Sequence, residues 1–107
     1  MKKIYICGKI SGMPFGEAEK DFQEAEEKLK DKYPEAELVN PIKLCKKIAS
    51  QYRLPAEIFE DWYWCMTVDF AELLSCDSIY LIAGWQSSEG AKIEEAIARV
   101  RKMNFLS

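Results

Sequence analysis

The chain of 107 residues contains no histidine. This absence excludes the catalytic groups in which a histidine activates a serine or a cysteine, together with the usual histidine-containing zinc sites. The four cysteines, at positions 7, 45, 65 and 76, show no CxxC or other metal-like spacing. Acid–base or nucleophilic chemistry must therefore rest on carboxylates, lysine, tyrosine, cysteine or serine, and we expect neither a metal nor another cofactor.

The sequence also lacks long apolar runs and an excess of basic residues. No apolar run approaches the ~20 residues that span a bilayer. The apolar run that ends at Cys7 is shorter than the ~7–15 residues of a signal-peptide core. A net charge of −3 argues against a broad nucleic-acid or membrane-binding surface. We therefore expect a cytoplasmic protein that binds neither nucleic acid polymers nor membranes.

The composition that is present, 49% hydrophobic and 31% charged, is that of a single globular domain spanning residues 1–107. Short apolar segments alternate along the chain with amphipathic ones, which predicts an α/β fold with a parallel sheet of three to four strands flanked by helices. We expect strands at residues 3–7, 36–39 and 78–82, a stub at 103–107, and helices at 15–33, 42–53, 58–75 and from residue 90 onward.

The segment from Cys76 to Ala98 combines a strand, a small-residue turn and the start of a helix. In an open α/β sheet this arrangement is the usual place for a ligand, and the helix N-terminus favours an anion. Ser88 is suited to cap this helix, and capping alone would explain it. Three acidic residues, Glu89, Glu94 and Glu95, lie in the first turns, and this local pattern does not choose among them.

Asp69 is the unusual residue of the helix expected at 58–75. It falls near the middle of an apolar stripe, where a carboxylate is costly unless it is hydrogen-bonded, protonated or facing a cleft. Two interpretations are open: a buried aspartate that caps a neighbouring loop, or a carboxylate that faces a ligand pocket. The opposite face is also apolar, which suggests cover by a second subunit; it consists of Trp64, Val68, Ala71 and Leu74.

Periodicity also predicts the packed faces of the first and last helices. The first helix is expected to bury Phe15, Ala18, Phe22, Ala25 and Leu29. The last is expected to bury Ile93, Ala96, Ile97 and Val100, with Glu94 near the margin of the stripe. An ordinary glutamate on the helix surface is therefore one open interpretation of Glu94.

Four motifs occur in a fixed order: YICGKISG at 5–12, VNP at 39–41, DFAELLSCD at 69–77 and GWQSSEGAKIEEAIA at 84–98. Together they resemble the nucleoside 2-deoxyribosyltransferase-like superfamily, and are most similar to a compact, largely uncharacterised branch of small phage and bacterial proteins. The resemblance covers nearly the entire chain, and its most specific part is Ser88-x-Gly90-Ala91-x-x-Glu94. It implies a doubly wound, flavodoxin-like sheet and a dimer or higher homo-oligomer.

The resemblance also implies a reaction on 2′-deoxynucleosides or their 5′-monophosphates. The glutamate matching Glu94 attacks C1′ and expels the base, and water or a second base resolves the glycosyl-enzyme intermediate. The aspartate matching Asp69 orients the nucleophile or protonates the departing base. The tyrosine matching Tyr5 and the loop from Gly8 to Gly12 line the sugar site, and the serine matching Ser88 binds a 5′-phosphate in the monophosphate-specific hydrolases.

The implied substrate site therefore consists of Tyr5, Gly8, Lys9, Ile10, Ser11, Gly12, Trp85, Ser88 and Gly90. Lys9 departs from the pattern, because relatives commonly have a small residue or proline there; it either recruits a phosphate or fills the site. Carboxylates suit this chemistry, since breaking an N-glycosidic bond passes through an oxocarbenium-like state. Two alternatives stay open: a nucleotide-binding protein of the same fold without turnover, and an interaction module that uses the face around Trp64.

Overall fold

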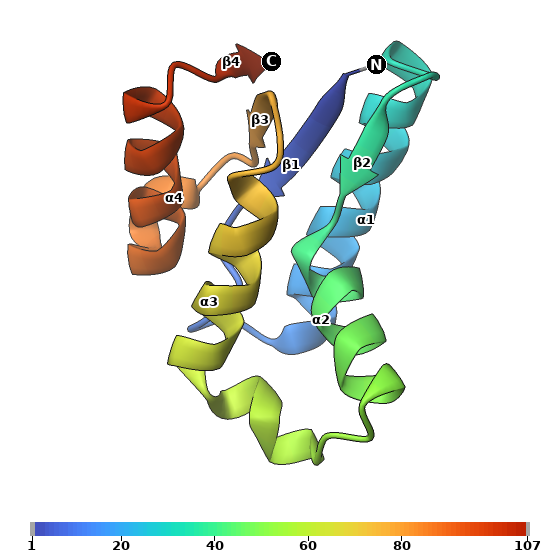
Figure 1. The fold of residues 1–107 in the computed structure, drawn as a ribbon, viewed down its shortest axis with the longest axis vertical. Coiled ribbons are helices and arrows are strands. Elements are labelled where there is room, and N and C mark those ends of the chain that lie inside the picture. Colours follow the sequence, from blue (N-terminus) through green and yellow to red (C-terminus); the bar gives the residue numbers. More distant parts are fainter. Residues whose placement is uncertain (1, 107) are drawn as a thin grey trace.

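The structure is a computed structural model that describes residues 2–106, and it contains a four-stranded parallel sheet flanked by helices (Figure 1). The strands are β1 (Lys3–Cys7), β2 (Glu37–Val39), β3 (Ser78–Leu81) and β4 (Asn104–Leu106), in the order β2-β1-β3-β4. The main helices are α1 (Phe15–Lys32), α2 (Pro41–Gln51), α3 (Trp62–Leu73) and α4 (Glu89–Val100). This confirms the predicted doubly wound, flavodoxin-like α/β fold.

The central strand β1 divides the core into two layers. Its side chains alternate between the two faces of the sheet, as extended chains require, and the four from Ile4 to Cys7 are fully buried. Ile4 and Ile6 pack with α1, whereas Tyr5 and Cys7 pack with residues of α3 and α4. A run that is apolar on both faces is typical of a strand covered by helices on both sides.

Helix α1 buries the predicted stripe with one exception. Ala18, Phe22, Ala25 and Leu29 are buried, but Phe15 remains 46% exposed. Phe15 is the first residue of the helix and lies at its end beyond the sheet, where Lys46 of α2 stacks over its ring. The periodicity identified the correct face of α1, but the apolar stripe begins one turn before the part of the helix that packs on the sheet.

The helix expected at 58–75 is divided in two. A short 3₁₀ helix, η1 (Ala56–Glu60), precedes α3, which begins after Asp61. The Asp61 side chain accepts a hydrogen bond from the backbone N–H of Trp64 at 3.0 Å, so it caps a new helix rather than continuing the old one. The apolar stripe continued across this N-cap, and periodicity alone therefore placed the helix start too early.

Helix α4 buries a different face from the one predicted. The expected stripe is wrong at both ends, because Ile93 is 38% exposed and Val100 is 79% exposed. The observed buried face consists of Gly90, Ala91, Glu94 and Ala98. Small residues allow this helix to lie close to the sheet and to α3, and that close approach buries the one carboxylate among them.

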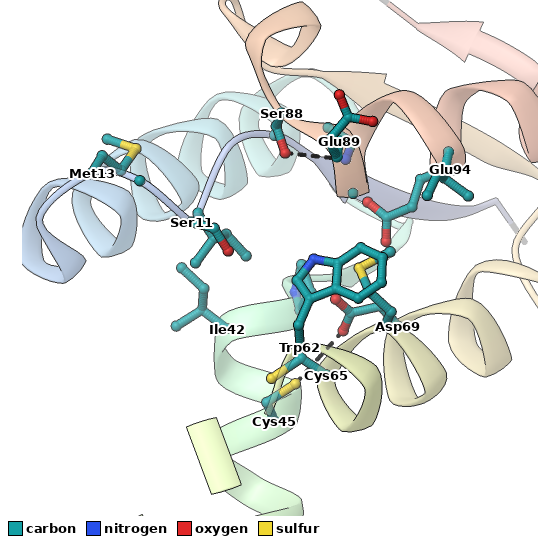
Figure 2. A pocket seen from close by; sticks show the side chains of 18 of the residues that line it. Ser11, Met13, Ile42, Cys45, Trp62, Cys65, Asp69, Ser88, Glu89 and Glu94 are labelled. Atoms are coloured by element: carbon teal, nitrogen blue, oxygen red, sulfur yellow. Dashed lines mark hydrogen bonds between the residues drawn. The ribbon is translucent and has the colours of Figure 1, made fainter. Parts of the chain in front are cut away.

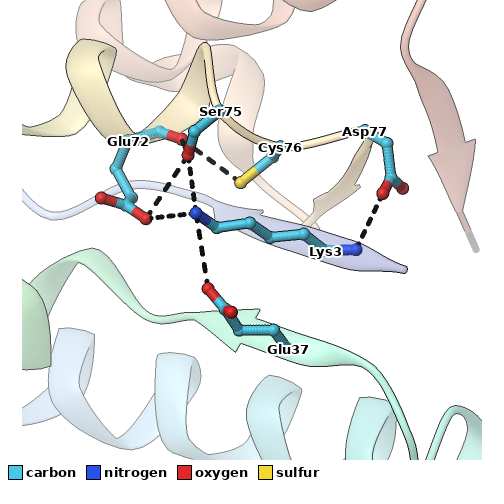
Figure 3. Close-up of polar contacts among 6 residues, drawn as sticks. All are labelled: Lys3, Glu37, Glu72, Ser75, Cys76 and Asp77. Carbon is cyan, nitrogen blue, oxygen red and sulfur yellow. Dashed lines mark hydrogen bonds and ion pairs between the residues drawn. The ribbon is translucent and has the colours of Figure 1, made fainter. Parts of the chain in front are cut away.

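The end of the sheet at which β1 begins is held by Lys3 (Figure 3). Its Nζ lies 2.8 Å from Glu72 and 3.4 Å from Glu37, and donates to the Ser75 hydroxyl at 2.7 Å. Its backbone N–H donates to Asp77 at 2.9 Å. One lysine thus ties β1 to β2 and to the end of α3, at the opposite end of the strand from Gly8.

The second apolar face of α3 is covered only in part by this chain. Trp64 is half-buried and packs edge-on against Phe59, while Ala71 and Leu74 are exposed. Cover of this face by a second subunit stays a prediction. Within residues 2–106, every helix is too short or too polar to cross a membrane.

The observed packing of α4 predicts that stability depends more on Ala98 than on Val100, whereas apolar periodicity alone predicts the reverse. We compare Ala98→Leu with Val100→Ser. Ala98 is fully buried, so Leu would overpack the contact between α4 and the sheet and cost about 1–3 kcal/mol of stability. Val100→Ser on the exposed side should change stability by less than about 0.5 kcal/mol. Urea denaturation of the two variants checks this, and a larger loss for Val100→Ser would contradict the observed packing of α4.

Candidate active site

A cavity of about 830 Å³ lies where the loops following β1, β2 and β3 meet (Figure 2). Its walls come from four places: the first loop, the start of α2, the η1–α3 segment and the start of α4. This is the position at which successive connections leave the sheet toward opposite faces, the usual ligand site of a doubly wound fold. Its polar lining consists of Ser11, Glu60, Asp69, Ser87, Ser88, Glu89 and Glu94.

The first loop begins at Gly8, directly after β1, and its shape depends on glycine. A Cβ at Gly8 would lie 3.0 Å from the Ile82 side chain, tighter than ordinary contacts. Gly12 has φ +82°, a backbone conformation that favours glycine. Ile10 and Ser11, between the two glycines, line the cavity.

The start of α4 forms the opposite wall. Ser88 caps the helix by accepting a hydrogen bond from the backbone N–H of Ala91 at 3.2 Å, as the sequence suggested. Gly90 lies against α3, since a Cβ there would be 3.0 Å from Met66 Sδ and 3.9 Å from Trp62 Nε1. The absence of a side chain at Gly90 therefore lets α4 and α3 meet at the cavity.

Glu94 is fixed by two residues of the central strand. It is only 5% exposed, which excludes the interpretation as a surface glutamate. The hydroxyl of Tyr5 donates to Glu94 Oε2 at 2.5 Å, and the thiol of Cys7 lies 3.5 Å from Oε1. Tyr5 and Cys7 are neighbours on one face of β1, so the sheet itself orients both oxygens of the carboxyl group.

Asp69 also lines the cavity and is likewise 5% exposed. The thiol of Cys45, on α2, lies 3.6 Å from its Oδ1. A thiol is a weak donor, whereas a loop-capping aspartate would accept backbone N–H groups. The surroundings therefore agree with a carboxyl group that faces the pocket.

Burial raises the pKa of both carboxyl groups. Desolvation raises the pKa of Asp69 to about 7, against a smaller lowering by the Cys45 hydrogen bond. Desolvation, and next the charge of Asp69, raise the pKa of Glu94 to about 8, while the hydrogen bonds from Tyr5 and Cys7 act in the opposite direction. The pKa of the Tyr5 hydroxyl lies well above its usual range, so Tyr5 remains a donor.

Residues 2–106 match a family described as a domain of unknown function, DUF4406. The chain belongs to the DUF4406 family. No curated protein and no solved structure matches it.

The structure of this DUF4406 chain brings most of the residues predicted for the site together. Eight line the cavity directly: Gly8, Ile10, Ser11, Gly12, Asp69, Ser88, Gly90 and Glu94. Tyr5 is fully buried and reaches the site through its hydrogen bond to Glu94. Lys9 and Trp85 do not line the cavity, and Trp85 instead packs against the core between the sheet and α4.

Several residues that line this DUF4406 site or, like Cys7, support Glu94 from outside the lining were not predicted. Cys7 could have been found, because it lies two residues after Tyr5 and must share its face of β1. Trp62 could also have been found from its place in the stripe with Asp69. Glu60 could not, since its position depends on the break between η1 and α3. Among residues 2–106, no three His, Cys, Asp or Glu side chains are grouped as a metal ion would require.

We predict that stability falls as the pH rises from about 5 to about 8. In this window the unfolded carboxyl groups are ionised, since their ordinary pKa values are 3.8 and 4.5, whereas the folded ones retain protons up to about 7 and 8. The folded state then binds more protons, so the free energy of unfolding decreases with pH. Glu94→Gln should reduce this decrease, as judged by melting temperature across the pH range.

Glu95→Gln is the matched control for this measurement. Glu95 is the next residue on α4 but pairs with Arg99 at 2.9 Å, and its pKa is lowered by that hydrogen bond. It does not line the cavity. The control should keep the wild-type decrease between pH 5 and 8; an unchanged slope in Glu94→Gln would show that Glu94 is not protonated in the folded protein.

Proposed function

We propose that the protein cleaves the N-glycosidic bond of 2′-deoxynucleosides or their 5′-monophosphates, through a covalent intermediate on Glu94. The observation that carries the proposal is a buried glutamate, oriented by a strand tyrosine, beside a second buried carboxyl group in one cavity. The resemblance to nucleoside 2-deoxyribosyltransferase-like proteins supports the substrate class. The doubly wound fold and the position of the cavity agree with it.

Glu94 suits the role of nucleophile. The Tyr5 hydroxyl and the Cys7 thiol hold the side chain in place, so little freedom is lost when it attacks C1′. As the C1′–N bond breaks, positive charge develops on the sugar, and a carboxylate stabilises it before forming the ester. Water or an acceptor base then attacks C1′ and releases Glu94.

Asp69 suits the role of acid. Its pKa of about 7 means that a substantial fraction carries a proton at neutral pH. A proton delivered to the departing base turns a poor leaving group into a neutral one. Asp69 comes from α3 and Glu94 from α4, so the two groups approach the cavity from different elements.

The two carboxyl groups titrate as a pair. The negative charge of Asp69 raises the pKa of Glu94, so protonating Asp69 removes one cause of that rise. The form with a proton on Asp69 and a charge on Glu94 has the donors Tyr5 and Cys7 directed at the charged group. We assign activity to this singly protonated form.

The first test is the release of free base. Each deoxynucleoside and deoxynucleoside 5′-monophosphate is incubated with the protein, with and without an acceptor base, and the products are separated by chromatography. We expect release from at least one, and Glu94→Ala should lower the rate by at least about 10³-fold because the nucleophile is lost. Transfer to the acceptor would distinguish a transferase from a hydrolase.

Glu95→Gln is again the matched control and should retain activity, since Glu95 lies outside the cavity lining. Tyr5→Phe should reduce the rate, because Glu94 loses the hydroxyl that orients it while the ring still fills its place in the core. Absence of release from every substrate at high protein concentration would overturn the proposed reaction. Binding of a nucleotide without release would instead favour a non-catalytic nucleotide-binding protein.

We further predict a bell-shaped dependence of kcat/KM on pH. The singly protonated pair dominates between the two pKa values of about 7 and about 8, so activity should peak in that interval and fall on either side. In Asp69→Asn the group whose loss of a proton ends the active form on the alkaline side is gone, so the alkaline limb should disappear from the residual activity. An alkaline limb that persists in this variant would contradict the assignment of Asp69 as the acid.

A further inference from the structure

The cavity is acidic. Four carboxyl groups line it, from Glu60, Asp69, Glu89 and Glu94, and no lysine or arginine of residues 2–106 is in the lining. Glu60 and Glu89 are exposed, whereas Asp69 and Glu94 are buried and have raised pKa values. The field in the cavity therefore favours a cation over an anion.

Three lysines that are adjacent in sequence to lining residues are themselves outside the lining. Lys92 forms an ion pair with Glu89 at 2.9 Å, and Lys46 pairs with Glu19 while it stacks over Phe15. Lys9 packs toward Gly12, with its Cε 3.6 Å from where a Cβ would be, and does not line the cavity. Lys9 is the one basic residue of the first loop, so it is the residue to test for phosphate binding.

The start of α4 is the feature that would favour an anion. Its first backbone N–H groups have no partner within the helix and carry partial positive charge. However, Ser88 already caps Ala91, and Glu89 brings a full negative charge to the same turn. A 5′-phosphate at this terminus would lie beside the Glu89 side chain, within a cavity lined by three more carboxyl groups.

An aromatic ring accompanies the carboxyl groups. Trp62 is 40% exposed and lines the same cavity as Glu94 and Asp69 (Figure 2). Tryptophan is the strongest of the aromatic side chains in binding a cation over its face. A planar base that carries a positive charge would meet both the ring and the carboxylates.

We infer that the cavity prefers an N-glycoside whose base carries a formal positive charge, such as an N7-alkylated purine deoxynucleoside, over neutral nucleosides and 5′-monophosphates. This inference rests on the proposed function for the cleavage step. It names a substrate class for the same site, and the charge of the lining is the observation behind it.

The chemistry of such a substrate matches the residues present. When Glu94 attacks C1′, the C1′–N9 bond breaks and its electron pair returns to the cationic purine, which leaves as a neutral base without taking up a proton. Water then attacks C1′, a proton is released, and the Glu94 carboxylate and 2-deoxyribose are formed. The reaction therefore does not need Asp69 as an acid, whereas cleavage of a neutral nucleoside does.

Binding is tested with two compounds that have no glycosidic bond to cleave: cationic 7,9-dimethyladeninium and neutral 9-methyladenine. Isothermal titration calorimetry at neutral pH should show at least about tenfold tighter binding of the cation, weakening as salt is added. Glu60→Gln should reduce the ratio of the two affinities about two- to fivefold. Glu57→Gln, on the same 3₁₀ helix but outside the lining, is the matched control and should leave the ratio unchanged.

Turnover is tested with 7-methyl-2′-deoxyguanosine, 2′-deoxyguanosine and 2′-deoxyguanosine 5′-monophosphate, after subtracting uncatalysed base release. Asp69→Asn should lower the rate on the neutral nucleoside by about 100-fold or more, but on the cationic one by less than about tenfold. The monophosphate should be the poorest substrate, and Lys9→Gln should not lower its kcat/KM selectively.

The outcomes separate the two proposals. Equal affinity for the cation and its neutral counterpart, or a preference for the monophosphate that Lys9→Gln abolishes, would overturn the inferred substrate class even if neutral nucleosides are cleaved. Preferential binding of the cation without cleavage of any nucleoside would overturn the proposed reaction and uphold the ligand preference. If Asp69→Asn lowers the cleavage rate of both nucleosides equally, departure of the cationic base also requires Asp69, and the inferred mechanism for this substrate class is wrong.

Discussion

The hydrogen bond from Tyr5 to Glu94 is the interaction on which the site depends. It joins the central strand to the last long helix through the interior of the protein, between two residues with almost no exposed surface. A carboxyl group can lie there only if the helix approaches closely and the strand supplies donors. Gly90, Ala91 and Ala98 allow the first, and the alternation of β1 provides the second.

Burial of two carboxyl groups at one cavity has an electrostatic consequence. Each is desolvated, and the charge of one opposes ionisation of the other, so protons are retained near neutrality. The folded protein thereby becomes less stable as pH rises, and the same retention makes an acid available for chemistry. Stability and the proposed reactivity therefore draw on a single physical cause.

Most of the fold could be predicted from local patterns, since strand β1 and the buried face of α1 follow directly from apolar periodicity. The start of α3 could not, because a cap at Asp61 interrupts a stripe that continues across it. The buried face predicted for α4 was wrong for a related reason. Large apolar residues such as Val100 defined the predicted stripe, whereas small residues and Glu94 form the buried face of the helix. Periodicity measures hydrophobicity, but close packing here depends on size.

The proposed reaction gives a reason for the burial of Glu94 that packing alone does not give. A glutamine in the same place would accept the hydrogen bond from Tyr5 and would fill the same volume without a charge to desolvate. The carboxyl group adds to the folded state only a pH-dependent cost. What it offers in return is an anion that can be formed beside a cavity, held by Tyr5 and Cys7 and aimed at a bound molecule. That property has no use in a purely structural contact, and it is what an attack on an electron-poor sugar carbon requires.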